Sequence, residues 1–170
     1  MENIDIYSEF FGLIATFFMF YSFTKTNDKT LIILHTVSNV FWGLHFLVLG
    51  ALAGAVSILF SLSRTAFVFK WNSKEAKLGF MFVLTLYCIY EASSIDNIHN
   101  ILPIIAAFIV SLGILFFDKN KLTLIFIISN ILWVNYTIIV GSISGTISYS
   151  IIILILIYRW IKIKKEIDND

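Results

Sequence analysis

Long apolar stretches separated by short polar markers run along most of this chain. An α-helix rises about 1.5 Å per residue, so about 20 residues cross the roughly 30 Å hydrocarbon core of a bilayer. Two pairs of stretches adjoin without a charged loop, but the glycines of GALAG and GSISG supply the tight turns that these connections need. We therefore expect seven transmembrane helices, at residues 8–24, 30–49, 52–70, 77–93, 100–117, 121–140 and 143–161.

The composition agrees with lipid as the solvent of this chain. Of its 170 residues, 59% are hydrophobic and 14% are charged, whereas a soluble domain carries more polar surface. The N-terminal segment is acidic and lacks the basic region of a signal peptide, so we expect its apolar stretch to be retained as a span. The sequence predicts an all-α polytopic membrane protein, with one membrane domain over residues 1–170.

The positions of lysine and arginine predict the orientation. With seven spans, all 12 of these residues lie on one side, in or around the ends of the first, third, fifth and seventh predicted helices. Short loops rich in lysine and arginine stay in the cytoplasm. We expect the N-terminus outside and the C-terminus in the cytoplasm.

A second pattern recurs ninety-one residues along the chain. SNVFWGLHFLVLGALAG, Ser38–Gly54, is matched by SNILWVNYTIIVGSISG, Ser129–Gly145, and upstream GLIATF is matched by PIIAAF. Each copy holds three predicted helices, 8–70 and 100–161, and the helix 77–93 links them. Corresponding helices lie four spans apart and run in the same direction, which predicts a parallel 3+1+3 repeat. Such duplication is typical of transporters; the alternative is a repeat that only builds a packed bundle.

Polar and aromatic side chains follow one face of the second helix in each copy. An asparagine amide in hydrocarbon needs a hydrogen-bond partner, so we expect these side chains to face the interior. Amides beside aromatic rings suit a flat or sugar-like ligand. Alternatively, the asparagines join helices and the tryptophans belong to an interfacial belt. The candidate substrate-binding residues are Asn39, Trp42, His45, Asn130, Trp133, Asn135 and Tyr136.

Charged residues near the predicted helix ends add further candidates. Arg64 lies in the last turns of the helix 52–70, where it can contact an anionic group, snorkel to the interface or pair with another helix. Glu91, Asp96 and His99 cluster around the outer loop between the fourth and fifth helices. A proton or cation site is one interpretation of this cluster, and solvated loop residues are the other.

Other chemistries have little support. The single Cys88 cannot form an internal disulfide, and no cysteine and histidine cluster has metal-ligand spacing. Motifs such as HExxH, GxSxG or a phosphate-binding glycine loop are absent from the sequence. The net charge of +1 argues against a nucleic-acid partner. We expect no enzymatic activity, cofactor or metal, and we expect the lipid bilayer and a small-molecule substrate as partners.

Three stretches of this chain resemble the YgjV-like family of bacterial inner-membrane proteins: FWGLHFLVLGALAGAVSILFSLSRTAFVF, ILPIIAAF and ILWVNYTIIVGSISGTIS. The family pattern is matched by His45-Phe46 before the first glycine turn, by Arg64, and by Trp133 before the second turn. Thr137 departs from it, at a position where family members tend to carry asparagine. The resemblance implies no particular activity. The 3+1+3 layout is similar to that of the SWEET sugar facilitators and the PnuC-type vitamin transporters, an analogy of architecture that implies no substrate.

We interpret the chain as a membrane facilitator of a small polar metabolite, such as a sugar, a nucleoside or a vitamin-like compound. Its central site is expected between the two three-helix bundles. The alternative is a non-transporting membrane scaffold or regulatory protein. The two differ in whether Asn39 and Asn130 face a shared cavity or are held in helix contacts.

Overall fold

The computed structural model describes residues 2–23, 28–70, 73–93, 97–117 and 119–168, and these are almost entirely helical. The all-α prediction with seven α-helices is confirmed for this part of the chain, which contains no strand. One short 3-10 helix, η1 (Ile98–Asn100), precedes α5. The helices are α1 (Glu2–Phe23), α2 (Asp28–Val48), α3 (Leu52–Lys70), α4 (Lys74–Ser93), α5 (Ile101–Phe116), α6 (Lys119–Ile139) and α7 (Ile143–Asp168).

Several of these helices are long and apolar enough to cross a membrane. Among the described residues, Ile98–Phe116, Lys121–Ile139 and Ile143–Ile161 meet that requirement. Shorter apolar segments lie in α1, α2 and α3. Large apolar side chains also cover much of the outer surface, including Phe17 at 63% and Leu154 at 68% exposure. Lipid accommodates such a surface, whereas water disfavours it.

The helix bounds differ from the expected spans mainly at the two ends of the chain. α1 begins at Glu2, ahead of residue 8, and α7 continues to Asp168, beyond residue 161. The hydrocarbon thickness limits the apolar stretch and not the helix, because backbone hydrogen bonds continue into the aqueous phase. Lys25, which was expected to mark the first cytoplasmic loop, lies outside the described residues.

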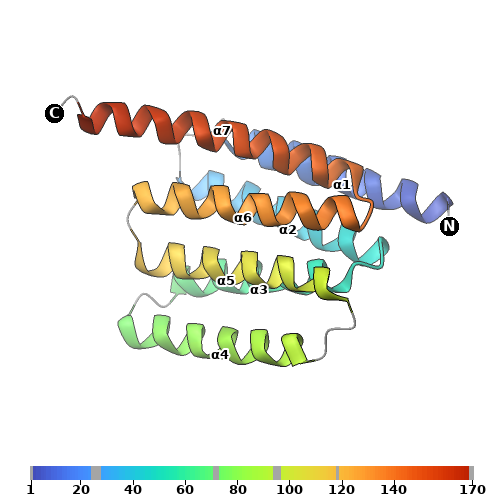
Figure 1. Cartoon of the computed structure of the whole chain (residues 1–170), viewed down its shortest axis with the longest axis horizontal. Helices are drawn as coiled ribbons and strands as arrows, with labels where there is room; N and C mark the ends of the chain where they lie inside the picture. Colours follow the sequence, from blue (N-terminus) through green and yellow to red (C-terminus); the bar gives the residue numbers. More distant parts are fainter. Residues whose placement is uncertain (1, 24–27, 71–72, 94–96, 118, 169–170) are drawn as a thin grey trace.

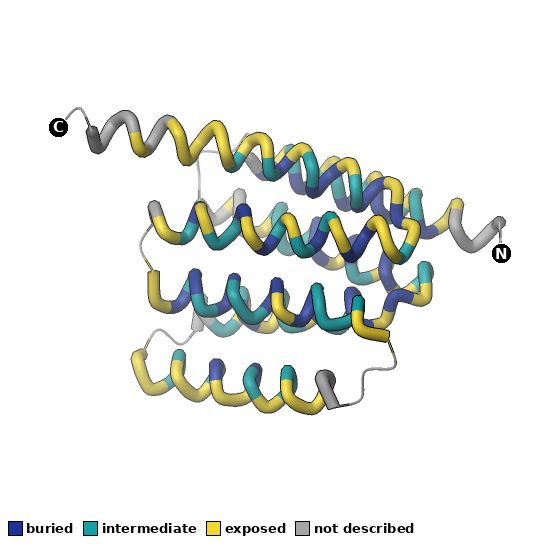
Figure 2. The backbone as a smooth tube through the Cα atoms, in the orientation of Figure 1, coloured by how far each residue is buried: buried dark blue, intermediate teal, exposed yellow. Residues whose placement is uncertain are grey.

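Contacts between helices connect six of them into a closed ring, in the order α1, α2, α3, α5, α6 and α7. The first group, α1–α3, packs in sequence order, as does the second group, α5–α7. The two groups meet where α1 contacts α7 and where α3 contacts α5. α4 packs on α5 outside the ring and is largely exposed (Figure 2). Consecutive helices run in opposite directions, so α1 begins at one end of the bundle and α7 ends at the other (Figure 1).

The α2–α3 and α6–α7 connections share one backbone conformation. Gly50 and Gly141 have φ angles of 76° and 77°. The amide of Ala51 donates to the carbonyl of Phe46 at 2.8 Å. In the second connection the amide of Ser142 donates to the carbonyl of Thr137 at 2.9 Å. These bonds belong to the Schellman motif, whose positive φ is strained for a residue with a Cβ. We call these connections the glycine turns.

The second glycine of each repeated pair permits close packing. A Cβ at Gly54 would lie 2.8 Å from Cε1 of Tyr136, so α3 and α6 approach each other only because that atom is missing. The Gly54 amide donates to the Tyr136 hydroxyl at 3.0 Å. At Gly145, a Cβ would lie 2.7 Å from Cγ2 of Thr137. The frame that recurs in the sequence therefore combines a turn glycine with a contact glycine.

Two serines make matching bonds between helices. Ser38 Oγ donates to the carbonyl of Ala15 at 2.8 Å and joins α2 to α1. Ninety-one residues further on, Ser129 Oγ donates to the carbonyl of Ala106 at 3.4 Å and joins α6 to α5. The sequence match thus extends to individual contacts. We call the end of the bundle with the glycine turns the glycine-turn end. The opposite end, where α4 and α6 begin and α7 ends, is the basic end, named for its lysines (Figure 1).

The glycine turns generate a stability prediction. Replacing Gly50 or Gly141 by Ala should lower the free energy of unfolding by about 1–2 kcal/mol, because the backbone is left-handed there and no atom lies within 4 Å of the added Cβ. Gly79→Ala is the matched control, since this glycine in α4 also has open space but no positive φ. It should raise stability by about 0.5–1 kcal/mol. Thermal unfolding in detergent measures all three, and a Gly50→Ala protein as stable as Gly79→Ala would contradict the turn assignment.

Candidate functional site

A cavity of about 510 Å³ lies between the two groups of helices. All six ring helices contribute to its lining, and among the described residues α4 contributes none. The lining runs from Trp42, Trp133 and Tyr149 to Arg64 and Arg159, which lie toward the basic end. Because Arg159 is exposed, the cavity reaches the surface on that side.

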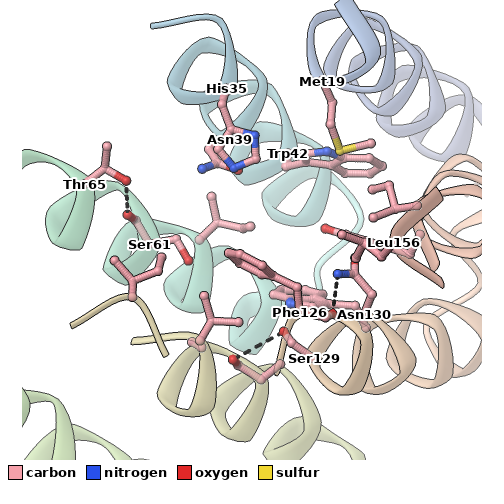
Figure 3. Close-up of a pocket in the computed structure, with 18 of the residues that line it drawn as sticks. Met19, His35, Asn39, Trp42, Ser61, Thr65, Phe126, Ser129, Asn130 and Leu156 are labelled. Carbon is pink, nitrogen blue, oxygen red and sulfur yellow. Dashed lines mark hydrogen bonds between the residues drawn. The ribbon is translucent and has the colours of Figure 1, made fainter. Parts of the chain in front are cut away.

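Two asparagines face this cavity, one from each group (Figure 3). Asn39 is 8% exposed, and its amide makes no hydrogen bond within the described part of the chain. Asn130 donates through Nδ2 to the carbonyl of Phe126, in its own helix, at 2.7 Å. Neither amide is bonded to a neighbouring helix within the described residues. They face a shared cavity, the arrangement that distinguishes a solute site from helix-joining contacts.

An aromatic layer bounds the cavity on the side of the glycine turns. The ring of Tyr149 stacks on Trp42 and on Trp133, with centroids 5.3 and 5.4 Å apart. Phe46 is fully buried, does not line the cavity, and stacks on both tryptophans. We call Trp42, Phe46, Trp133 and Tyr149 the aromatic layer. It joins the two groups of helices through apolar contact.

A polar layer lies beyond the aromatic layer, at the glycine-turn end. His45 is fully buried, with Nδ1 2.7 Å from the carbonyl oxygen of Ser8 and Nε2 2.8 Å from Oγ of Ser142. Because a carbonyl oxygen only accepts, Nδ1 carries the proton, and a neutral ring accepts at Nε2 from the Ser142 hydroxyl. One side chain of α2 thereby connects α1 to the second glycine turn.

The starts of α3 and α7 are also held in the polar layer. The Glu9 carboxylate accepts from the amides of Ile143 and Ser144 at 3.0 and 2.7 Å. A negative charge at a helix N-terminus is favourable, and these amides have no partner within their own helix. At α3, the Tyr136 hydroxyl accepts from the Gly54 amide. Each group thus caps a helix of the other group at this end.

Arg64 occupies a different environment near the basic end. It is 7% exposed and lines the cavity. Its Nη1 donates to Oγ of Ser111 at 3.0 Å, a bond that crosses from α3 to α5. Its Nε is buried and has no hydrogen-bond partner among the described residues. Of the roles considered from the sequence, the contact with Ser111 fits a structural pair, and the place of the side chain in the lining fits a contact with an anionic group.

The structure brings some of the predicted site residues together and separates others. His45 and Tyr136 lie in the polar layer and do not line the cavity. Asn135 is exposed and donates to the carbonyl of Ile131 in its own helix, because one helical step from position 136 turns it outward. A ligand role for each residue stays a prediction. The predicted residues that line the cavity are Asn39, Trp42, Arg64, Asn130 and Trp133.

Other lining residues escaped the sequence analysis. His35 lies four residues before Asn39, so the spacing that selected Asn39 and Trp42 also includes His35. Tyr149 and Arg159 line the cavity from α7, where no polar pattern drew attention to them. In the outer loop, Asp96 and the Glu91 side chain lie outside the described residues. The described part of the chain contains no group of three histidine, cysteine or acidic residues placed to hold a metal ion.

The fold and cavity define a helical membrane protein with a central pocket between two groups of three helices. Residues 6–167 match the Imp-YgjV family, described as bacterial inner membrane protein. The chain belongs to this family, which confirms the resemblance drawn from the sequence and the bacterial inner membrane as its location. No curated protein and no solved structure matches the chain.

The polar layer yields a prediction for Tyr136. Tyr136→Phe should lower the free energy of unfolding by about 1–3 kcal/mol, because it leaves the buried Gly54 amide without a partner. Tyr158→Phe removes the same atom from a side chain that is 72% exposed, so it should change stability by less than about 0.5 kcal/mol. Thermal unfolding in detergent compares the two. Equal effects would show that the Tyr136 hydroxyl carries no structural role.

Proposed function

We propose that this protein is a facilitator that moves a small polar metabolite, such as a sugar, a nucleoside or a vitamin-like compound, across the inner membrane. The observation that carries the proposal is the cavity between the two groups, which Asn39 and Asn130 face from opposite sides. Its volume of about 510 Å³ falls in the usual range for small-molecule sites, roughly 300–1,000 Å³. A buried amide without a protein partner is costly in a purely structural bundle, and a polar solute removes that cost.

The proposal includes the parallel 3+1+3 repeat of seven transmembrane helices, with α4 as the linker. It is supported by the matching turns, by the matching serine bonds and by the similar places of Trp42 and Trp133 around one cavity. This layout is similar to that of the SWEET and PnuC-type transporters. In such proteins two similar bundles rock around a site near the middle of the membrane.

The positions of the polar layer and the cavity support a particular conformational state. Contacts between the groups concentrate at the glycine-turn end, through His45, Tyr136 and Glu9, while the cavity reaches the surface toward the basic end. With the lysine-rich end in the cytoplasm and the N-terminus outside, this is an inward-open state. Opening to the outside requires those contacts to break. Each neutral hydrogen bond contributes about 0.5–1.5 kcal/mol net and each bond to the Glu9 carboxylate about 1.5–3 kcal/mol, so the outward state requires new contacts that offset this loss.

Within the cavity, the residues have separate roles in this proposal. The Asn39 and Asn130 amides bond to hydroxyl or amide groups of the solute, and the faces and edges of Trp42 and Trp133 contact its carbon skeleton. Binding is followed by rocking of the two groups, with no covalent change in the solute. The activity is therefore transport and not enzymatic catalysis.

The test is uptake by proteoliposomes, with radiolabelled sugars, nucleosides and vitamins screened first on the wild type. For a transported solute, Asn39→Leu and Asn130→Leu should each reduce uptake at least about tenfold, because they remove hydrogen bonds to the solute. Asn135→Leu makes the same change at an exposed position outside the cavity and should leave uptake unchanged. If the screen finds no transported solute and a copurifying protein stabilises the chain, the scaffold alternative replaces the facilitator.

A further inference from the structure

The two groups line the cavity with different chemistry at equivalent positions. His35 of the first group corresponds to Phe126 of the second, and both line the cavity (Figure 3). Arg64 lines it from the first group, whereas Ile155, ninety-one residues later, does not. Both groups carry an asparagine at the equivalent position, Asn39 or Asn130, whereas His35 and Arg64 of the first group have no equivalent histidine or arginine in the second. The cavity thus has a polar wall on α2 and α3 with His35 and Arg64. On α6 and α7 it has a wall of mostly apolar side chains, called the apolar wall, with Asn130 within it and Arg159 at its exposed end.

Within the described part of the chain, no acidic side chain lines the cavity beside the guanidinium of Arg64. Arg64 is 7% exposed. Ser111 satisfies Nη1, and Nε has no partner among the described residues. An arginine buried within a membrane protein is unfavourable unless it is paired or reaches water. A guanidinium that lines a cavity offers a planar set of donors that matches a carboxylate or phosphate group.

Two further unpartnered polar groups belong to residues that line the cavity. Nε1 of Trp42 is buried without a hydrogen-bond partner in the described residues, and the Trp42 side chain is 1% exposed. The Asn39 amide is likewise unbonded there. The apolar wall presents Phe126 and Leu156 to the cavity (Figure 3), and Trp133 also lines it. The lining therefore combines donors for an acceptor-rich head group with a flat apolar surface for the rest of a molecule.

We propose that the cavity binds a small organic anion, with its carboxylate or phosphate group on Arg64 and its planar or apolar body against the wall formed by Phe126 and Trp133. Asn39 donates to a remaining acceptor of the solute. The proposal rests on the proposed function in taking the cavity as a solute site. It narrows the substrate to anionic members of the polar metabolites considered above. Arg159 at the exposed end of the cavity attracts anions from the cytoplasm.

Binding is measured on the full chain in nanodiscs of phosphatidylcholine alone, by thermal shift and calorimetry. The probes are benzoate and benzamide, which share shape and differ in charge, together with phenyl phosphate. The wild type should bind benzoate or phenyl phosphate at least about tenfold more tightly than benzamide, because hydrogen bonds to a charged group are roughly twice as strong as neutral ones and Arg64 has no other counter-ion among the described residues. This comparison depends on no variant.

Variants then locate the preference. Arg64→Gln should abolish the difference between benzoate and benzamide, and Arg64→Lys, which keeps the charge but not the fork, should retain part of it. Lys74→Gln is the matched control, since it removes a cation at the start of α4, which lines no part of the cavity among the described residues. It should leave the preference unchanged. Equal loss in Lys74→Gln and Arg64→Gln would overturn the assignment to Arg64.

The outcomes separate the two proposals. Benzamide binding as tightly as benzoate would overturn the anion proposal, while uptake of a neutral solute would still support the facilitator. Arg64-dependent anion binding without transport of any anion would support this inference and count against the facilitator.

A further experiment replaces part of the phosphatidylcholine in the nanodiscs by phosphatidylglycerol. Stabilisation by that lipid through Arg64, with none by benzoate or phenyl phosphate, would assign the site to a lipid head group and overturn the solute proposal.

Discussion

A polar group buried in a membrane protein must find its hydrogen-bond partner within the protein or in something bound to it, and this constraint organises the whole bundle. In the polar layer it is met inside the chain. His45 is bonded on both ring nitrogens, and Glu9 accepts from two amides of α7. Around the cavity it is not met, because Asn39 and the Nε of Arg64 have no partner among the described residues. The contrast separates the closed glycine-turn end from the cavity that we propose as a binding site.

Helix geometry explains much of what could be predicted from the sequence. Apolar stretches of about 20 residues, divided by polar loops, were enough to place seven helices, and the paired glycines marked turns that no charge interrupts. The three-residue spacing of Asn39 and Trp42 correctly placed both on one face, because that spacing brings side chains together on a helix. Local periodicity therefore accounts for the helices and for the face that lines the cavity.

The periodicity of the sequence predicts which face of a helix is buried. It does not predict which residues of the neighbouring helices each side chain on that face will contact. His45 shares the face of Trp42 but lies one turn nearer the glycine turn, where Ser8 and Ser142 approach from distant parts of the chain. It belongs to the polar layer for that reason. The capping of α7 by Glu9 joins residues more than a hundred positions apart, and no local sequence pattern predicts it. Only the packing of the helices in three dimensions reveals these contacts.

Thiol accessibility tests most directly whether one cavity opens to the cytoplasm and is closed to the outside. In a Cys88→Ala background, Ser61→Cys places a thiol in the lining, and Ser57→Cys places one a single helical turn away on a fully buried side chain. Inside-out and right-side-out vesicles are treated with a membrane-impermeant thiol reagent. The account predicts that residue 61 reacts faster from the cytoplasmic side and that residue 57 reacts from neither. Faster reaction of residue 61 from the outside, or equal reaction of both positions, would contradict it.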